Sequence, residues 1–186
     1  MQVIRSELPG VLVLEPKVFG DARGFFYESF NARAFEQATG LACEFVQDNH
    51  SRSQRGVLRG LHYQVQQAQG KLVRVTAGEV FDVVVDLRSS SPSFGRWLGV
   101  HLSAENKRQV WVPEGFAHGF VTLSERAVFT YLCTATYDAA ADANVRWDDP
   151  RLAIDWPVTD PQLSGKDAAA PLLDDVALDR LPIFST

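Results

Sequence analysis

The stretch from Glu44 to Tyr137 constrains the fold most, because it contains many short β-prone segments and shows no helical periodicity. Turn-forming residues, such as Gly78-Glu79 and Ser124-Glu125, separate these segments. Many short strands at this spacing are typical of an all-β sandwich or barrel, whereas βαβ units would place amphipathic helices between the strands. The segments that we expect to form strands are residues 45–46, 57–64, 72–76, 80–87, 97–102, 109–112, 119–123 and 128–137.

An N-terminal arm, residues 1–45, precedes the β-rich stretch. It combines a strand-like run at 11–14 with an aromatic, β-prone run at 25–30. Asn31 then provides an N-cap for a short helix, and Gly40 ends that helix.

The C-terminal part, residues 141–186, consists of loops and short helices. Ser164-Gly165-Lys166-Asp167 has the spacing of a capping box, which opens a helix. We also expect a small helix over 174–181. With no linker or internal repeat, the sequence predicts one domain over 1–186, with the barrel at about 46–140.

Composition excludes several classes of protein. The chain has 186 residues, 46% of them hydrophobic, which suits a globular domain with a substantial core. A net charge of -5 argues against a general nucleic-acid surface. No apolar run approaches the roughly 20 residues that span a bilayer, and no signal-peptide pattern opens the chain. The two cysteines, Cys43 and Cys133, form no metal-binding or disulfide pattern. We therefore expect a soluble cytoplasmic protein with reduced thiols.

His62 is the first candidate for chemistry, because an imidazole titrates near neutral pH. It lies in the expected strand 57–64, in which regular alternation puts Leu58 and His62 on one face and Arg59 on the other. Arg59 and His62 serve one pocket only if the strand bulges or ends between them. Gly60 is the natural place for such a bulge. The alternative is a structural histidine within a strand.

A metal site is not expected. Metal-binding barrels of this type typically show two histidines one residue apart, followed by a carboxylate. His62 is followed by Tyr63-Gln64, and the other three histidines, His50, His101 and His118, lie far from it in the sequence.

Three more residues have both a functional and an ordinary interpretation, and a fourth, Asp167, has an ordinary one. Lys71 is either a solvated lysine at a strand end or a cation that stabilises an oxyanion. Tyr131 is either a core residue or an acid facing a cavity. His118 follows a Gly-containing turn and either lines the rim of a pocket or belongs to an ordinary hairpin. Asp167 is the acidic residue of the capping box.

Seven stretches of the chain together resemble the deoxythymidine-diphosphate (dTDP)-4-dehydrorhamnose 3,5-epimerases of the cupin superfamily. The resemblance covers nearly the whole chain, and its most specific part is Arg59-Gly60-Leu61-His62 combined with the stretch 113–120. The matching stretches are residues 20–28, 45–51, 58–64, 69–74, 78–83, 113–120 and 163–168.

The resemblance implies a mostly β, cupin-type jelly-roll barrel with a few short helices. It implies an isomerase that converts dTDP-4-dehydro-6-deoxy-glucose to dTDP-4-dehydro-L-rhamnose, a step of dTDP-L-rhamnose synthesis for bacterial surface polysaccharide. It also implies that the enzyme needs no metal or cofactor and forms a homodimer, in which the N-terminal strand reaches the neighbouring site.

The resemblance also assigns roles to residues. His62 corresponds to the base, Tyr131 to the acid across the sugar ring, Asp167 to the carboxylate partner of His62, and Lys71 to the lysine that stabilises the enolate. Tyr137 corresponds to the aromatic residue that stacks on thymine. The residues at the family's substrate-binding positions are Arg23, Phe26, Glu28, Gln47, Asn49, Arg59, His118, Tyr137, Asp142 and Lys166, with Asp142 standing near a position where some relatives have glutamate.

Three other functions stay open at this point. A related enzyme inverts only one carbon or acts on another deoxysugar nucleotide. A non-catalytic cupin binds the sugar nucleotide without exchanging its protons, which the presence of His62 and Tyr131 argues against. A metal-dependent oxygenase would need the paired histidines that this sequence lacks.

Overall fold

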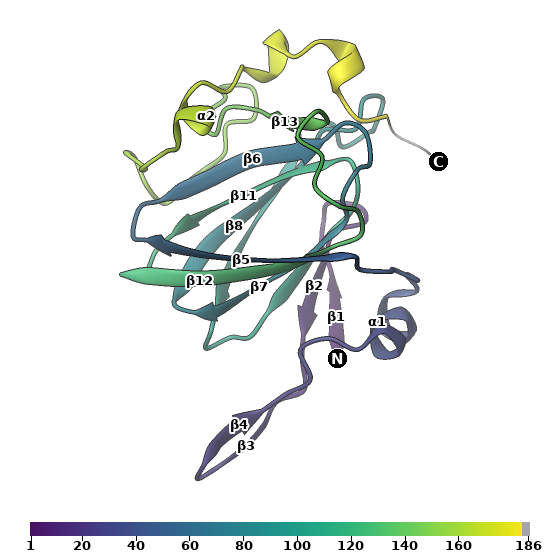
Figure 1. Ribbon diagram of the computed structural model, residues 1–186, viewed down its shortest axis with the longest axis vertical. Coiled ribbons are helices and arrows are strands. Elements are labelled where there is room, and N and C mark those ends of the chain that lie inside the picture. The colour runs from purple at the N-terminus through teal and green to yellow at the C-terminus, as the bar shows by residue number, and fades with distance from the viewer. Residues whose placement is uncertain (184–186) are drawn as a thin grey trace.

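The computed structural model describes residues 1–183, which form two antiparallel β-sheets facing each other (Figure 1). The six-stranded sheet has the order β1 (Gln2–Arg5), β2 (Leu12–Glu15), β10 (Gln109–Val112), β7 (Lys71–Ala77), β12 (Arg126–Cys133) and β5 (Gln47–Gln54). The five-stranded sheet has the order β13 (Asp142–Asn144), β6 (Leu58–Gln64), β11 (Phe116–Thr122), β8 (Glu79–Asp86) and β9 (Trp97–Ser103). This cupin-type jelly-roll barrel confirms the expected fold class.

The remaining elements lie outside the two sheets. A hairpin of β3 (Phe19–Asp21) and β4 (Gly24–Phe26) projects from the barrel at the lower end of Figure 1. The helices are α1 (Ala32–Thr39) and α2 (Gly165–Ala168), and two 3-10 turns span Leu173–Asp175 and Leu178–Arg180.

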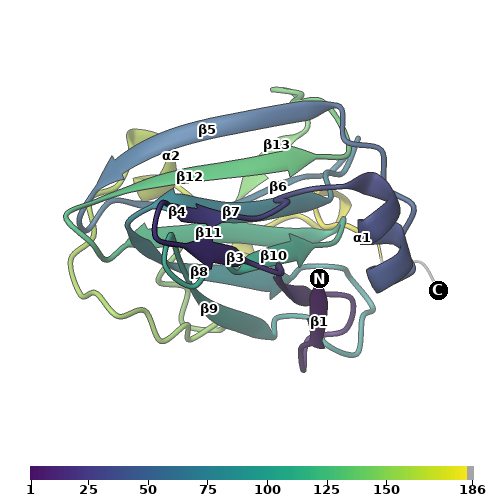
Figure 2. The same ribbon diagram turned by 90° about the horizontal axis from the view of Figure 1, so that it is seen from below.

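Each sheet buries apolar side chains on both faces. Between the sheets, Val73, Val84 and Phe129 belong to one buried cluster. The outer face of the five-stranded sheet packs against the C-terminal segment, which contributes Leu152 to a second cluster. Part of the outer face of the six-stranded sheet packs against α1, where Phe35 is buried; Figure 2 shows α1 at the side of the barrel.

The caps of α1 confirm the sequence prediction. The Asn31 side chain accepts a hydrogen bond from the backbone N–H of Ala34 at 3.0 Å. Gly40 ends the helix with φ of 79°, in the left-handed region that favours glycine. By contrast, the helix expected over 174–181 is replaced by the two 3-10 turns.

Strand β5 departs most from the sequence prediction. A strand was expected at 45–46, but it begins at Gln47 and continues to Gln54. Its residues are polar, and it pairs with β12 along its whole length. The inward-facing Asn49 and Ser51 line a cavity rather than the core. The strand therefore lacks the apolar alternation by which strands are recognised.

Other strands also differ from the prediction. Strand β11 begins at Phe116 instead of 119, which places His118 in mid-strand rather than at the rim of a turn. Strand β12 ends at Cys133, so Tyr137 does not continue it. Strand β13 was not predicted; it is short and is recruited by pairing with β6.

Asp86, at the end of β8, is completely buried and is satisfied by several donors. It accepts hydrogen bonds from Arg88 at 2.8 Å, from Ser91 at 2.7 Å and from Ser93 at 2.7 Å. Burial by itself would raise the pKa of Asp86, but the bonds from Arg88 and the two serines outweigh it and lower that pKa. The carboxylate therefore stabilises the folded state when it is ionised.

We expect Asp86→Asn to lower the free energy of unfolding by about 1–3 kcal/mol at neutral pH, because the buried donors lose a charged acceptor. The folded-state pKa lies below the unfolded value of about 3.9, so the contribution is complete above that value and is lost as the pH falls through the folded pKa. The difference between wild type and variant should thus shrink below about pH 4. Urea unfolding at pH 7 and pH 3.5 measures the difference in free energy of unfolding between wild type and variant. The same difference at both pH values would contradict a stabilising role of the ionised Asp86.

Candidate active site

A cavity of about 250 Å³ opens between the two sheets. Strands β5, β6, β7, β11 and β12 all contribute to it. Its lining residues are Asn49, His50, Ser51, Arg59, His62, Lys71, His118, Phe120, Phe129 and Tyr131. Six of the residues that the sequence predicted for the site are thus brought together: Asn49, Arg59, His62, Lys71, His118 and Tyr131.

His62 is paired with a carboxylate from the C-terminal segment. Its Nε2 lies 2.5 Å from Oδ1 of Asp167, 105 positions further along the chain. Asp167 is held by Ser164, whose hydroxyl donates to Oδ2 at 2.9 Å and accepts from the Asp167 backbone N–H at 3.1 Å. The capping box and the pairing with His62 are therefore not alternatives. The helix cap aims the carboxylate at the histidine.

The electrostatics of this pair keep Asp167 ionised. Its side chain is only 4% exposed, and burial alone would raise its pKa. The hydrogen bond and the charge of His62, together with the hydrogen bond from Ser164, outweigh burial and lower the pKa of Asp167. An ionised carboxylate binds the hydrogen on Nε2 and leaves Nδ1 as the basic nitrogen. Within residues 1–183, no hydrogen bond occupies Nδ1 of His62.

An irregularity in β6 brings Arg59 and His62 onto one face. Arg59 pairs with Phe120 and His62 with His118, so β6 has one residue more than β11 between these pairs. Gly60 has φ of 137°, and a Cβ there would lie 2.6 Å from Cα of Gly119. The expected bulge at Gly60 is confirmed.

The residues around the bulge divide between two faces. Leu58, Leu61 and Tyr63 pack beneath the C-terminal segment, whereas Arg59 and His62 line the cavity. Uniform alternation, which would put Leu58 beside His62, therefore does not hold in this strand. The Arg59 Nε donates to the hydroxyl of Ser53 at 3.0 Å, which holds the guanidinium at the cavity wall. The peptide bond between Gly60 and Leu61 is cis.

Gly119→Ala should disrupt this site, because the new Cβ would lie 2.7 Å from the carbonyl oxygen of Arg59 and 3.1 Å from Cα of Gly60. Neither backbone atom can move without shifting Arg59 and His62, and a misplacement of about 1 Å can reduce turnover by about 10²-fold. Steady-state kinetics measures the effect. Gly165→Ala is the control, because nothing lies within 4 Å of its new Cβ. Equal activity of both variants would contradict the role of the close backbone contact.

Lys71 is a buried lysine and not a solvated one at a strand end. It is only 9% exposed. Burial lowers its pKa, and the interactions with Cys133, Asp142 and Asp82 act in the opposite direction. A cation that is largely removed from water interacts strongly with negative charge that develops beside it.

Tyr131 extends into the cavity from β12. Burial raises its pKa, Cys133 raises it further, and Arg59 acts in the opposite direction. The phenol therefore carries its hydrogen at neutral pH. Tyr131 and His62 both line the cavity, so a protonated phenol and a basic imidazole face one space.

Two predicted residues form a polar chain at the edge of the cavity. Gln47 donates to the side-chain oxygen of Asn49 at 3.1 Å, and Asn49 donates to the sulfur of Cys133 at 3.5 Å. Gln47 also accepts from the backbone N–H of Tyr137 at 2.8 Å. Both cysteines were expected to be buried; Cys133 is buried and orients the Asn49 amide, whereas Cys43 is only partly buried.

Tyr137, Asp142 and Lys166 form a separate cluster next to the cavity. The Tyr137 hydroxyl donates to Oδ2 of Asp142 at 3.0 Å, and the ammonium group of Lys166 contacts the same oxygen. Lys166 also precedes Asp167 in α2, so this cluster adjoins the pair that orients His62.

Arg23, Phe26 and Glu28 do not reach this cavity in their own chain. Arg23 and Phe26 lie in or beside the projecting hairpin, where Arg23 pairs with Asp21 at 2.5 Å and Phe26 is 70% exposed (Figure 1). Glu28 follows β4 and accepts a hydrogen bond from Asn31 at 3.2 Å. The structure of one chain therefore does not bring these three predicted contacts to the site.

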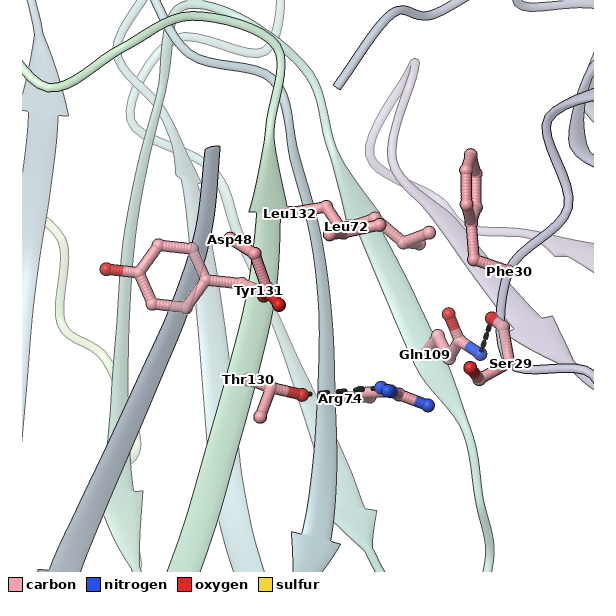
Figure 3. Close-up of a pocket in the computed structure, with 9 residues that line it drawn as sticks. All are labelled: Ser29, Phe30, Asp48, Leu72, Arg74, Gln109, Thr130, Tyr131 and Leu132. Carbon is pink, nitrogen blue, oxygen red and sulfur yellow. Dashed lines mark hydrogen bonds between the residues drawn. The ribbon is translucent and has the colours of Figure 1, made fainter. Parts of the chain in front are cut away.

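A second cavity, of about 210 Å³, lies on the outer side of the six-stranded sheet (Figure 3). Its polar contacts are a bond from Arg74 to Thr130 at 3.3 Å and one from Gln109 to the carbonyl of Ser29 at 2.7 Å. Figure 3 shows the Tyr131 ring pointing away from Arg74 and Gln109. No paired acid and base line this cavity, so it does not compete with the one between the sheets.

Some lining residues were missed by the sequence interpretation. Phe120 and Phe129 have the apolar pattern of core residues, and only the fold shows that their rings bound the cavity. His50 and Ser51 lie in β5, where the polar sequence concealed the strand. Within residues 1–183, no three histidine, cysteine or carboxylate side chains are grouped to hold a metal ion, and no helix is long and apolar enough to cross a membrane.

Comparison with known proteins identifies relatives of this chain. Residues 5–175 match the family model described as dTDP-4-dehydrorhamnose 3,5-epimerase. The enzyme of that name from Salmonella typhimurium is 59% identical over 180 residues, which cover 96% of this chain and 98% of the relative.

Solved structures agree with the sequence matches. A dTDP-6-deoxy-D-glucose-3,5-epimerase from Legionella pneumophila, in complex with dTDP-4-keto-L-rhamnose, has a TM-score of 0.97 and 55% identity, covering 100% of this chain and 99% of the other. A more distant match is a 3'-monoepimerase from Streptomyces bikiniensis in complex with dTDP-quinovose. Its TM-score is 0.90 at 36% identity, covering 98% of this chain and 93% of the other.

Proposed function

The chain belongs to the dTDP-4-dehydrorhamnose 3,5-epimerase family, and we propose that it inverts C3 and C5 of dTDP-4-dehydro-6-deoxy-glucose to form dTDP-4-dehydro-L-rhamnose. The observation that carries this proposal is the cavity between the sheets, where His62 paired with Asp167 faces the same space as Tyr131. The Legionella relative was solved with dTDP-4-keto-L-rhamnose, which is a keto-deoxysugar nucleotide like the proposed substrate and product.

The reaction needs an acid, a base and positive charge beside one oxygen. The ketone at C4 makes the hydrogens on C3 and C5 acidic, because removing either gives an enolate. His62 takes the proton through Nδ1, and Asp167 stabilises the imidazolium that forms. Tyr131 returns a proton to the opposite face of the carbon. Protons alone are moved, so the chemistry calls for no redox cofactor.

Lys71 stabilises the enolate. Negative charge develops on the C4 oxygen as the proton leaves, and a desolvated ammonium group opposes that charge more strongly than a solvated one. The burial of Lys71 supports this role. A contact that is equally strong in the substrate and in the enolate does not increase kcat. The contact of Lys71 with the C4 oxygen increases kcat because it strengthens as negative charge develops on that oxygen.

The nucleotide half of the substrate binds beside the sugar. Arg59, at the cavity wall, and Lys166 provide positive charge for the diphosphate. Tyr137 is 57% exposed, which leaves its ring available to stack on thymine. Asp142 orients both Tyr137 and Lys166 through one carboxylate oxygen. Gln47, Asn49 and His118 complete the predicted contacts.

The protein acts as a homodimer in which each hairpin completes the partner's site. Phe19, Phe25 and Phe26 are 54%, 62% and 70% exposed on the projecting hairpin, a large apolar surface for a segment held by so few contacts of its own. Docking on a second copy would bury this surface. It would also bring Arg23 and Glu28 to the partner's cavity, which they cannot reach in their own chain.

His62→Ala and Tyr131→Phe should each lower kcat by about 10²–10⁴-fold, the usual contribution of a positioned base or acid. The assay couples turnover of dTDP-4-dehydro-6-deoxy-glucose to a rhamnose-forming reductase, in D₂O, and proton NMR locates deuterium at C3 and C5. Wild-type enzyme that exchanges neither carbon would refute the proposed function. Exchange at one carbon only would identify a single-carbon epimerase, and normal inversion of both carbons by Tyr131→Phe would refute its role as the acid.

The shared site predicts complementation between inactive variants. A dimer of one His62→Ala chain and one Arg23→Ala chain contains one intact site, made of His62 from one copy and the hairpin of the other. Random mixing after co-refolding should therefore restore about a quarter of wild-type activity in an isologous dimer. If Arg23 serves its own chain, or if the protein is a monomer, the mixture will show only the averaged residual activities of the two variants.

A further inference from the structure

The cavity contains a second histidine–carboxylate pair, and the carboxylate of this pair has no role in the proposed reaction. Nε2 of His118 lies 2.8 Å from Oδ2 of Asp82. The Asp82 side chain is 0% exposed and that of His118 is 8% exposed, so this pair is buried more deeply than His62 and Asp167. Asp82 belongs to β8, and its neighbours on the inward face, Val80 and Val84, are core residues. A carboxylate in this position is unusual and calls for an explanation.

The two pairs have matching geometry. His118 and His62 are directly paired across β11 and β6. Each ring has Nε2 on a buried carboxylate, and within residues 1–183 neither Nδ1 has a hydrogen-bond partner. Both rings line the cavity, so both Nδ1 atoms are available to whatever occupies it.

The surroundings hold the His118 ring in one orientation. Phe129 stacks on it with the ring centroids 5.9 Å apart and the planes at 29°. Phe129 in turn stacks on Phe120 at 4.1 Å and 12°. Asp82 behind the ring and Phe129 on its face leave little freedom of rotation, so Nδ1 is preorganised.

The second oxygen of Asp82 shows that this arrangement is unfavourable for stability. Among the described residues, Oδ1 of Asp82 is buried without a hydrogen-bond partner, as is the hydroxyl of Thr122. Burying a carboxylate oxygen without a partner opposes folding. Asp86, on the same strand and equally buried, is by contrast bonded at both oxygens. Strain of this kind is typically retained at functional sites.

We propose that Asp82 is a positioning residue which holds His118 so that its Nδ1 donates a hydrogen bond to the C4 oxygen of the sugar as the enolate forms. This inference rests on the proposed function. This role differs from that of His62 because it requires the ring of His118 to carry hydrogen on both nitrogens, with the carboxylate of Asp82 as the counter-charge. No proton needs to be transferred, because the donor only stabilises the charge that His62 creates when it deprotonates the sugar.

Lys71 and His118 thus act on the same oxygen. Lys71 and His118 line the same cavity, and Asp82 acts on the pKa of Lys71 against the effect of burial. His62 and Tyr131 move the protons, and Lys71 and His118 receive the charge.

Asp82→Asn should lower kcat about 10- to 100-fold with little change in KM, because a carboxylate that orients a functional histidine contributes about that much. His118→Gln should lower kcat by about 10²-fold, the usual effect of losing one oxyanion donor. Asp82→Asn should have no further effect in the His118→Gln background, because it acts only through the ring. Thermal unfolding should show a smaller loss of stability for Asp82→Asn than for Asp86→Asn, because Oδ1 of Asp82 has no hydrogen bond to lose.

Asp86→Asn is the matched control, since it removes an equally buried aspartate charge from the same strand outside the cavity. It should reduce stability and leave kcat unchanged. Wild-type kcat in Asp82→Asn, a multiplicative loss in the double variant, or a loss of stability as large as that of the control would each overturn the inference. Turnover by the wild type in the same assay separates these results from a failure of the proposed function.

Discussion

The close approach of β6 and β11 at Gly60 and Gly119 is the contact on which the site depends. At this point the two backbones are too near for a Cβ on either strand, and the extra residue in β6 turns Arg59 and His62 to the same face. Without the bulge, the alternation of the strand would direct one of them beneath the C-terminal segment. A local irregularity, rather than the regular sheet, therefore places Arg59 and His62 together on the wall of the cavity.

Several charged side chains of the barrel are buried away from water. They differ in how far hydrogen bonds and ion pairs compensate for the lost hydration. Asp167 is bonded by a histidine and by the serine that caps its own helix. Asp86 is satisfied by an arginine and two serines, and it serves stability. Lys71 and Asp82 are the incompletely compensated groups, and both lie at the cavity. Desolvated charge without full pairing stabilises the fold poorly but interacts strongly with a reacting ligand.

The site is assembled from segments that are distant in the sequence. The barrel strands supply the proposed base, acid and cations, whereas the C-terminal segment supplies the carboxylate that is hydrogen-bonded to the proposed base. The projecting hairpin supplies nothing to its own cavity, which is the physical reason for proposing that two copies exchange it (Figure 1). Even the N-cap of the four-residue helix α2 contributes to the proposed site, because it holds the carboxylate that bonds His62.

The sequence by itself determined the fold class, the caps of α1 and α2, the requirement for a bulge at Gly60, and, through family resemblance, the choice of His62, Tyr131, Asp167 and Lys71. These features depend on local pattern or on motifs. Tertiary structure alone decided that β5 is a strand, that His118 lies in mid-strand, and that Asp82 lies behind it. Those outcomes arise from pairing between distant strands: a polar strand that lines a cavity has no apolar alternation, and a buried aspartate among valines is indistinguishable in sequence from an exposed one.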